Sequence, residues 1–235
     1  MELDITGARI FFTLPIDVPF LGPLRISETM VISWLVMILI TGLCIWLTHD
    51  LKEENDMKAK VLRSEYLSRR AWMTARCDTL ELPDGRIVPE YYVLEYPDWV
   101  ATIALTEQGD FVFVRQYRHG LGVTEYELCS GVCDPSDASP LEAAQRELLE
   151  ETGFGGGQWE PIMAISANPG TQNNLTHCFV ARGVRPVGER HLDDTEDLTV
   201  HVLSLDQVRE LLLGDRIKQA THVAPLWKFF AQQKW

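Results

Sequence analysis

Three glutamates near the middle of this 235-residue chain have the residue type and the spacing of a metal-binding helix face. Glu147, Glu150 and Glu151 are related by i, i+3 and i+4, so an α-helix would place their carboxylates on one face. Like charges at this spacing weaken an isolated helix by about 0.2–0.5 kcal/mol per pair. A bound cation offsets that repulsion, and carboxylate oxygens suit hard divalent ions. The pattern predicts a metal-dependent catalytic helix, with Mg²⁺ as the metal and Mn²⁺ as its substitute; a solvated charged face is the alternative.

The residues around these glutamates predict where the helix begins and ends. Ser139 can serve as the N-cap, Pro140 as the first helical residue, and Glu142 as the third residue of a capping box. Gly153 tolerates left-handed backbone geometry and ends the helix. Four apolar residues form a separate stripe along the same helix: Leu141, Ala144, Leu148 and Leu149. The helix is therefore expected to pack with one side and to present its carboxylates with another.

Short β-type runs, turn signals and amphipathic segments surround this helix. The expected elements are hairpin strands at 78–82 and 87–94 and at 100–105 and 111–117, later strands at 161–165, 177–181 and up to residue 202, and closing helices at 205–213 and 223–230. Strands that arrive before, between and after helices argue for an α/β protein, in which a mixed sheet carries helices on both sides.

Two arginines lie on and just beyond the last strand of the second hairpin. Arg115 and Arg118 are candidate substrate ligands, because a guanidinium group can grip a diphosphate with two hydrogen bonds. A solvated strand end or a structural ion pair is the alternative for each of them.

From about Val61 onward the chain resembles the Nudix hydrolases. Their motif reads Gly, five residues, Glu, seven residues, Arg-Glu, an apolar residue, any residue, Glu-Glu, any residue, Gly and an apolar residue. Residues 146–154 match the second half without a gap. In the first half, Asp137 stands where the motif has glutamate, and eight residues rather than seven separate it from Arg146. The resemblance implies a Nudix-type α/β/α sandwich with a mixed β-sheet, and the departure puts the geometry of the loop before the helix in question.

The resemblance also implies roles for individual residues. The family's first acidic residue, here Asp137, mainly orders the loop. A catalytic base or further metal ligand comes from the loop before a late strand, where Glu196 fits best and Asp194 second, with an exposed acidic loop as the alternative. The implied site consists of Glu147, Glu150, Glu151 and the Ser130 carbonyl as metal ligands, Glu150 and Glu196 as catalytic groups, and Arg115, Arg118 and Glu127 as substrate contacts.

Pro169 lies 15 residues beyond Phe154, which is typical of the ADP-ribose and ADP-sugar branch of the family. The resemblance therefore implies metal-dependent hydrolysis of ADP-ribose to AMP and ribose 5-phosphate. Two alternatives stay open: a pyrophosphatase for other nucleotide sugars or dinucleotides, and a Nudix-like module that binds its ligand without cleaving it. Relatives of this branch pair as homodimers through their N-terminal strands, here near residues 76–95.

The N-terminal region has a different character. Residues 30–47 are an uncharged run of 18 residues with Trp34 and Trp46 near its ends, which predicts one transmembrane helix. Lysines and an arginine follow the run, so the N-terminus is expected outside and the catalytic domain in the cytoplasm, tethered to the cell membrane. A buried core helix is the alternative.

Residues 1–52 resemble the start of the bacterial ATP synthase a subunit, and a gene fusion or a start codon placed too far upstream would explain them. The charged segment 49–60 predicts a linker. We therefore expect an N-terminal segment at 1–56 and a Nudix hydrolase domain at 57–235. A soluble cytoplasmic protein starting at Met57 is the alternative.

Composition excludes one class of partner. The chain has 21 basic and 34 acidic residues and a net charge of −13, so it lacks a basic face for a nucleic-acid backbone. Five scattered cysteines indicate free thiols in a reducing compartment.

Overall fold

The computed structural model describes residues 10–18, 22–48, 58–192 and 197–233. The chain forms two compact units, one of residues 1–59 with 82–84 and the other of residues 60–81 with 85–235. The predicted domain boundary between residues 56 and 57 lies outside the described residues, as does most of the predicted linker.

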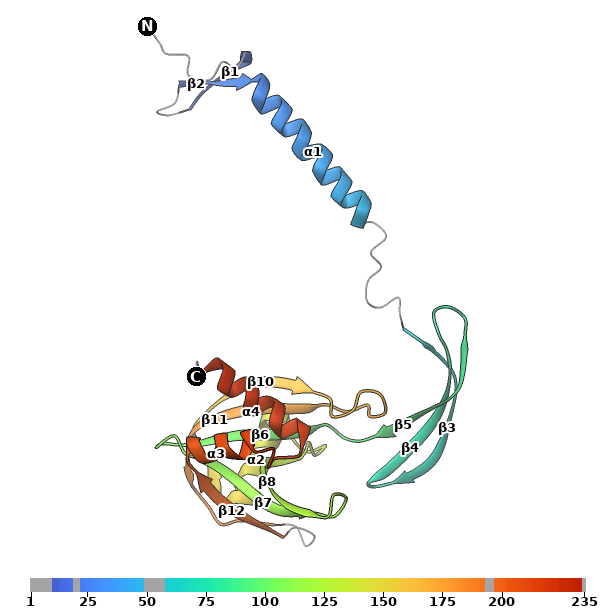
Figure 1. Cartoon of the computed structure of the whole chain (residues 1–235), viewed down its shortest axis with the longest axis vertical. Coiled ribbons are helices and arrows are strands. Elements are labelled where there is room, and N and C mark those ends of the chain that lie inside the picture. Colours follow the sequence, from blue (N-terminus) through green and yellow to red (C-terminus); the bar gives the residue numbers. More distant parts are fainter. Residues whose placement is uncertain (1–9, 19–21, 49–57, 193–196, 234–235) are drawn as a thin grey trace. The chain divides into compact units, whose positions relative to one another are not determined.

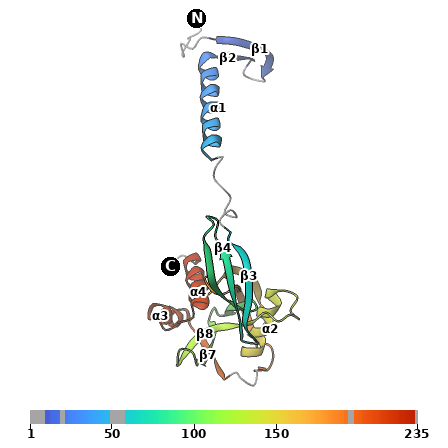
Figure 2. The ribbon, with the colours of Figure 1, turned by 90° about the vertical axis from the view of Figure 1, so that its right-hand side faces the viewer.

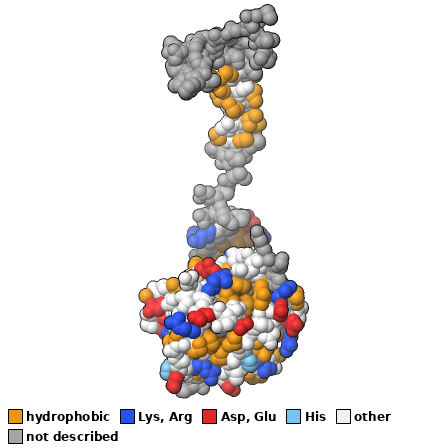
Figure 3. Space-filling view, turned by 90° about the vertical axis from the view of Figure 1, so that its left-hand side faces the viewer, with side chains coloured by type: hydrophobic (Ala, Val, Ile, Leu, Met, Phe, Trp, Pro, Cys, Tyr) orange, Lys and Arg blue, Asp and Glu red, His pale blue; other side chains and the backbone are white. Residues whose placement is uncertain are grey.

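The first unit contains a hairpin and a helix (Figure 1). Strand β1 (Ile10–Val18) pairs antiparallel with β2 (Gly22–Ser27), and α1 (Glu28–Thr48) follows. Apolar side chains cover the part of α1 whose side chains are described, residues 30–46 (Figure 3).

The membrane prediction for this helix is not supported. In the part of the chain that the structure describes, no helix is long and apolar enough to cross a membrane. The prediction of a transmembrane helix at 30–47 is therefore not supported, and the membrane anchoring inferred from it is not shown.

The second unit opens with a three-stranded antiparallel sheet. It consists of β3 (Lys60–Arg70), β4 (Met73–Glu81) and β5 (Ile87–Glu95), in that order. The β4–β5 hairpin and its turn match the first predicted hairpin. Strand β3 was not predicted, because ten of its 11 residues are exposed and charged residues interrupt the apolar alternation that marks a half-buried strand.

The main sheet is mixed, as predicted. Its strands are β6 (Trp99–Thr106), β7 (Phe111–Arg118), β8 (Val123–Val132), β10 (Gln158–Ile165), β11 (Thr176–Pro186) and β12 (Leu198–Leu203), with the short β9 (Phe154–Gly155) paired to β11. The order is β10-β11-β6-β8-β7-β12. Strands β11 and β6 run parallel, whereas the other pairs along this order are antiparallel.

Helices cover both faces of this sheet (Figure 2). Helix α2 (Pro140–Thr152) packs through Leu148 on Val112 and Cys129, while α3 (Leu205–Leu213) and α4 (Ala220–Gln232) pack on Phe111 and Phe113. Neighbouring residues of β7 therefore serve opposite faces, as the period of two in a strand requires. The five cysteines are free thiols, as predicted.

The β6–β7 hairpin separates to admit β8. Strand β6 pairs with β7 only near the turn, at Ala104 with Val112 and Leu105 with Phe111. Beyond that point β8 lies between them, with residues 123–128 paired to β7 and residues 129–132 paired to β6. Residues 127–131 therefore sit where β8 changes partner, and α2 lies against this strand.

Candidate active site

Helix α2 begins and ends as predicted, with one difference in its cap. The Glu142 backbone N–H donates to Ser139 Oγ over 3.2 Å, and Gly153 has a left-handed φ of 75° with its N–H donating to the Leu149 carbonyl. The Glu142 carboxylate, however, accepts from the Ala138 N–H at 2.7 Å rather than from the Ser139 N–H. The predicted capping box is therefore wrong in its second half, and Glu142 secures the preceding loop instead.

Two carboxylates of α2 face consecutive residues of β8. Glu151 is 2 % exposed, and its Oε2 accepts a hydrogen bond from the Ser130 N–H at 3.1 Å. The Glu147 carboxyl lies so close to the Gly131 backbone that a Cβ there would fall 2.0 Å from Glu147 Cδ. Only glycine leaves room for this approach. The helix and the strand thus bring Glu147, Glu151 and Ser130 together.

Arg146 holds the acidic groups around the start of the site. Its guanidinium donates to Glu147 and to Glu150, each at 2.9 Å, and to the Val132 carbonyl at 2.9 Å. It also donates twice to Asp137, at 3.1 and 2.9 Å. The hydrogen bonds to Asp137, Glu147 and Glu150 raise the pKa of Arg146. In turn, the hydrogen bond from Arg146 lowers the pKa of Asp137.

Asp137 orders the loop in spite of its shorter side chain and the extra residue. Besides holding Arg146, its Oδ2 accepts the Asp134 N–H at 2.8 Å. The Asp134 carboxylate in turn accepts the Ser136 N–H at 2.8 Å and its hydroxyl at 2.6 Å, which closes a compact turn. This turn takes up the added length, so that Asp137 still reaches the arginine that begins the acidic run of α2.

The Asp137–Arg146 pair predicts a measurable pH dependence of stability. We expect Asp137→Asn to lower the free energy of unfolding at pH 7 by about 1–3 kcal/mol, because it leaves Arg146 with a weaker partner. The folded-state pKa of Asp137 is below its ordinary value, so its stabilisation is complete above about pH 4 and is lost as the pH falls below that. Urea unfolding of both proteins at pH 7 and pH 3 measures this difference.

Asp206→Asn is the matched control, since Asp206 is 86 % exposed and lies 3.8 Å from Arg209. We expect it to change stability by less than about 0.5 kcal/mol. An Asp137→Asn effect that is equally large at both pH values would contradict the electrostatic origin.

Two residues predicted to bind substrate bind each other. Glu127 is fully buried, and Arg118 donates to its two carboxylate oxygens at 2.7 and 2.5 Å. Gln116 adds a hydrogen bond of 3.3 Å to the same carboxylate. The contact with Glu127 raises the pKa of Arg118. The structural ion pair left open for Arg118 is therefore present, and Arg118 also lines the pocket described below.

The other two candidate residues lie apart from this group. Arg115 is three positions from Arg118 on β7 and so points to the opposite face. It is exposed, with its guanidinium carbon 5.6 Å from the centre of the Tyr126 ring. Glu196 lies outside the described residues, as does Asp194.

A pocket of about 490 Å³ adjoins the end of β8. Its wall includes residues 130–132 of β8, Arg118, two tryptophans (Trp72 and Trp99) and residues 219–222 at the start of α4. Ser130 and Gly131, which lie against Glu151 and Glu147, line this pocket, whereas the glutamates of α2 are not among its described lining residues. Its size suits a nucleotide-sized ligand.

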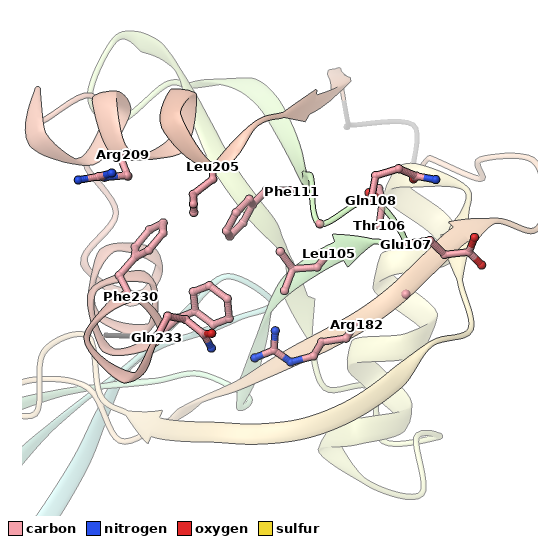
Figure 4. Close-up of a pocket in the computed structure, with 13 residues that line it drawn as sticks. Leu105, Thr106, Glu107, Gln108, Phe111, Arg182, Leu205, Arg209, Phe230 and Gln233 are labelled. Carbon is pink, nitrogen blue, oxygen red and sulfur yellow. The ribbon is translucent and has the colours of Figure 1, made fainter. Parts of the chain in front are cut away.

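A second pocket of about 550 Å³ is lined by the far ends of β6 and α4 (Figure 4). Its floor is apolar, with Leu105, Phe111 and Phe230 around it. None of the residues predicted for metal or diphosphate binding lines it. This pocket is the larger of the two, but the predicted site residues Arg118 and Ser130 line the other one.

The oxygen donors at the end of β8 suit a divalent metal in kind. Glu147, Glu151 and a backbone carbonyl are hard ligands of the type that Mg²⁺ and Mn²⁺ prefer. Among the described residues, however, no group of three or more acidic, histidine or cysteine side chains converges as a ready-made metal site. Glu147 and Glu150 contact Arg146, and Glu151 contacts Ser130. Because Gly131 has no Cβ, the Glu147 carboxyl can lie against β8, and a metal site at the end of β8 requires this close approach.

Sequence reasoning did not single out the histidine of the pocket wall. His222 is completely buried at the start of α4, and neither of its ring nitrogens has a hydrogen-bond partner among the described residues. No local motif marks this histidine. Helix α4 was predicted from residue 223, because its N-cap Gln219 makes no side-chain capping bond that a sequence pattern could reveal.

The mixed sheet with helices on both faces is the fold of a Nudix hydrolase, and comparison with known families agrees. The NUDIX domain family matches residues 96–226, more than half of the chain, and the nucleoside diphosphate sugar hydrolase N-terminal domain matches residues 60–94. The chain therefore belongs to the Nudix family and is a Nudix hydrolase.

The chain is also similar to individual characterised proteins. The chain is 29% identical to ADP-ribose pyrophosphatase from Mycobacterium tuberculosis, over 70% of this chain and 80% of that protein. It is also 29% identical to the methanol dehydrogenase activator from Bacillus methanolicus, over 67% of this chain and 85% of that protein. A solved ADP compounds hydrolase has a TM-score of 0.66 and 25% identity, covering 75% of this chain and 95% of that one.

Proposed function

We propose that this Nudix hydrolase cleaves the pyrophosphate bond of ADP-ribose to release AMP and ribose 5-phosphate. The observation that carries the proposal is the placement of Glu147 and Glu151 on residues 130–131 of β8, at the edge of a pocket with aromatic and arginine walls. The likeness to an ADP-ribose pyrophosphatase and to an ADP compounds hydrolase supports the choice of substrate.

We assign metal binding to Glu147, Glu150, Glu151 and the Ser130 carbonyl. A divalent ion held there would neutralise the charge of the diphosphate and make water more acidic. Mg²⁺ is our first choice and Mn²⁺ the substitute. The assignment rests on the donor types and on the closeness of Glu147 and Glu151 to β8.

The chain's own residues would do the remaining work. A water oxygen attacks one phosphorus, the bridging P–O bond breaks, and the proton of the water passes to a carboxylate, for which we propose Glu196 or Glu150. Arg118 donates hydrogen bonds from Nε and Nη2 to Glu127, and we assign its Nη1 to the diphosphate. The Glu127 carboxylate fixes the guanidinium in that position.

A hydrolysis screen tests this function. The purified chain is incubated with ADP-ribose, other nucleotide sugars, dinucleotides and nucleoside triphosphates, with Mg²⁺ and with Mg²⁺ plus excess EDTA. We expect the highest kcat/KM for ADP-ribose, with AMP as a product, and we expect EDTA to abolish turnover and added Mg²⁺ or Mn²⁺ to restore it. Absence of turnover across the whole panel would contradict the enzymatic proposal.

A second candidate is a Nudix module that binds a nucleotide without cleaving it. The observation in its favour is that Arg146 contacts both Glu147 and Glu150, while the likeness to a protein named as an activator gives it a precedent. Calorimetry with ADP-ribose in EDTA, followed by the turnover assay, separates the two functions: binding with no turnover in Mg²⁺ or Mn²⁺ supports the second.

Two further expectations remain proposals. We propose a homodimer formed through β3, β4 and β5, which expose a set of large apolar side chains: Val61, Tyr66, Leu67, Trp72, Met73, Ile87 and Tyr92. An apolar surface of this kind is typical of a protein interface. We also retain the cytoplasm as the proposed location of the catalytic domain.

A further inference from the structure

The pocket beside Ser130 contains a buried histidine that the hydrolysis as described does not use. His222 lines this pocket, is 0% exposed, and has both Nδ1 and Nε2 without a hydrogen-bond partner among the described residues. Burying a polar atom without a partner costs stability, so protein interiors rarely retain one without a reason. Two such atoms on one ring leave a donor and an acceptor in the pocket wall that no described residue satisfies.

The charges near His222 limit what that partner can be. Its electrostatic neighbours are Glu127 and Arg118, which already neutralise each other through two hydrogen bonds. Glu125, also buried, accepts the Lys218 N–H just before α4. The surroundings of the ring therefore carry no excess positive charge, and Arg118 Nη1, which we assign to the diphosphate, makes no hydrogen bond to the ring.

The protonation state of the ring limits the partner further. Burial lowers the pKa of His222 to about 4, so the imidazole is neutral at physiological pH. A neutral imidazole has one N–H donor and one acceptor nitrogen. A hydroxyl is also both a donor and an acceptor, whereas a phosphate oxygen would satisfy only the donor and would repel the other nitrogen.

We propose that His222 is a substrate-contacting residue that hydrogen-bonds a sugar hydroxyl of the nucleotide substrate. The inference rests on the proposed function and deepens it, because it names the part of the substrate that the start of α4 recognises. The hydroxyl can belong to the ribose of the adenosine or to the terminal sugar. In either case the bond is made in the ground state and in the transition state alike, so it contributes to KM rather than to kcat.

Substitutions at His222 separate a substrate contact from a structural role. His222→Phe keeps a planar ring and removes both nitrogens, His222→Leu removes both nitrogens and the ring, and His222→Gln keeps a hydrogen-bond donor and an acceptor. With ADP-ribose and Mg²⁺ we expect a rise in KM of about tenfold in the Phe and Leu variants, with kcat within about threefold. His222→Gln should recover most of the loss.

Thermal unfolding without ligand is the second measurement. The apolar variants remove unpaired polar atoms from the interior, so their Tm should equal or exceed that of the wild type. A structural histidine would give the reverse, a lower Tm with an unchanged KM. That result in the Phe and Leu variants would overturn the proposal.

Inhibition by the two products locates the hydroxyl. AMP carries the ribose of the adenosine, and ribose 5-phosphate carries the terminal sugar. A rise in the inhibition constant of AMP in His222→Phe assigns the contact to the adenosine ribose, and a rise for ribose 5-phosphate assigns it to the terminal sugar. If KM and both inhibition constants are unchanged, His222 contacts no sugar hydroxyl.

The failure of this inference differs from the failure of the proposed function. A wild-type protein that hydrolyses none of the nucleotides contradicts the function. Calorimetric binding of ADP-ribose in EDTA then still tests His222, because weaker binding in His222→Phe than in the wild type supports the contact, whereas equal binding or no binding by the wild type overturns it.

Discussion

Glu151→Gln is expected to lower kcat for ADP-ribose hydrolysis by about 10³-fold, which corresponds to about 4 kcal/mol of lost transition-state stabilisation. The side chain is almost completely buried and accepts the Ser130 N–H. Glutamine keeps an oxygen for that hydrogen bond and removes the negative charge that a metal ligand requires. The fold should therefore survive while metal-dependent chemistry is lost. Steady-state kinetics across a Mg²⁺ titration, with circular dichroism as a check of folding, measures both effects.

Glu142→Gln is the matched control for this substitution. Glu142 lies on the same helix and also accepts a backbone N–H, that of Ala138, but it is exposed and lies in the first turn. We expect its kcat to stay within about twofold of the wild type, since it is distant from β8. Equal losses in the two variants would show that the charge of the helix as a whole, rather than the position of Glu151, determines activity.

The parts of the site that could be predicted are those encoded by local patterns. The start of α2 at Ser139 and its end at Gly153 follow from capping preferences, and the face that carries Glu147, Glu150 and Glu151 follows from helical periodicity. The closing helix α3 matches the bounds that its amphipathic pattern predicted, and in the structure Ser204 and Gln207 form a complete capping box at its start. Capping residues and helical periodicity are sufficient to predict a helix because both depend only on residues a few positions apart.

The remaining features depend on contacts between distant segments. The pairing of Arg118 with Glu127 requires β7 and β8 to lie side by side, and the burial of His222 requires α4 to close over the sheet 90 residues after β8. The loop of Asp137 was in doubt because of its extra residue and its aspartate in place of glutamate, yet the Asp134 turn takes up the extra residue and Asp137 still reaches Arg146. Such compensation is visible only when the side chains are placed.

Gly131→Ala is expected to lower kcat/KM for ADP-ribose by about 10²-fold with little loss of stability. A Cβ at this position would lie 2.0–2.3 Å from three atoms of the Glu147 carboxyl group, so the carboxylate has to move away from β8. The atoms in conflict are the end of a flexible side chain that is partly exposed, and they can rotate at small cost to the fold. A displacement of about 1 Å at a catalytic group is sufficient to cost about 10²-fold in rate. Kinetics and Tm on the same preparation measure the two effects.

Gly120→Ala is the matched control, because a Cβ at Gly120 would meet no atom within 4 Å and its φ is not in the left-handed region. This variant adds the same methyl group to the same domain, and we expect its kinetics and Tm to equal those of the wild type. If Gly131→Ala instead kept full activity, Glu147 would not need its position against β8, and its assignment as a metal ligand would be refuted. If it unfolded the protein, Gly131 would serve the packing of α2 on the sheet. The predicted result, a folded protein with a displaced Glu147, is specific to a glycine that makes room for a ligand.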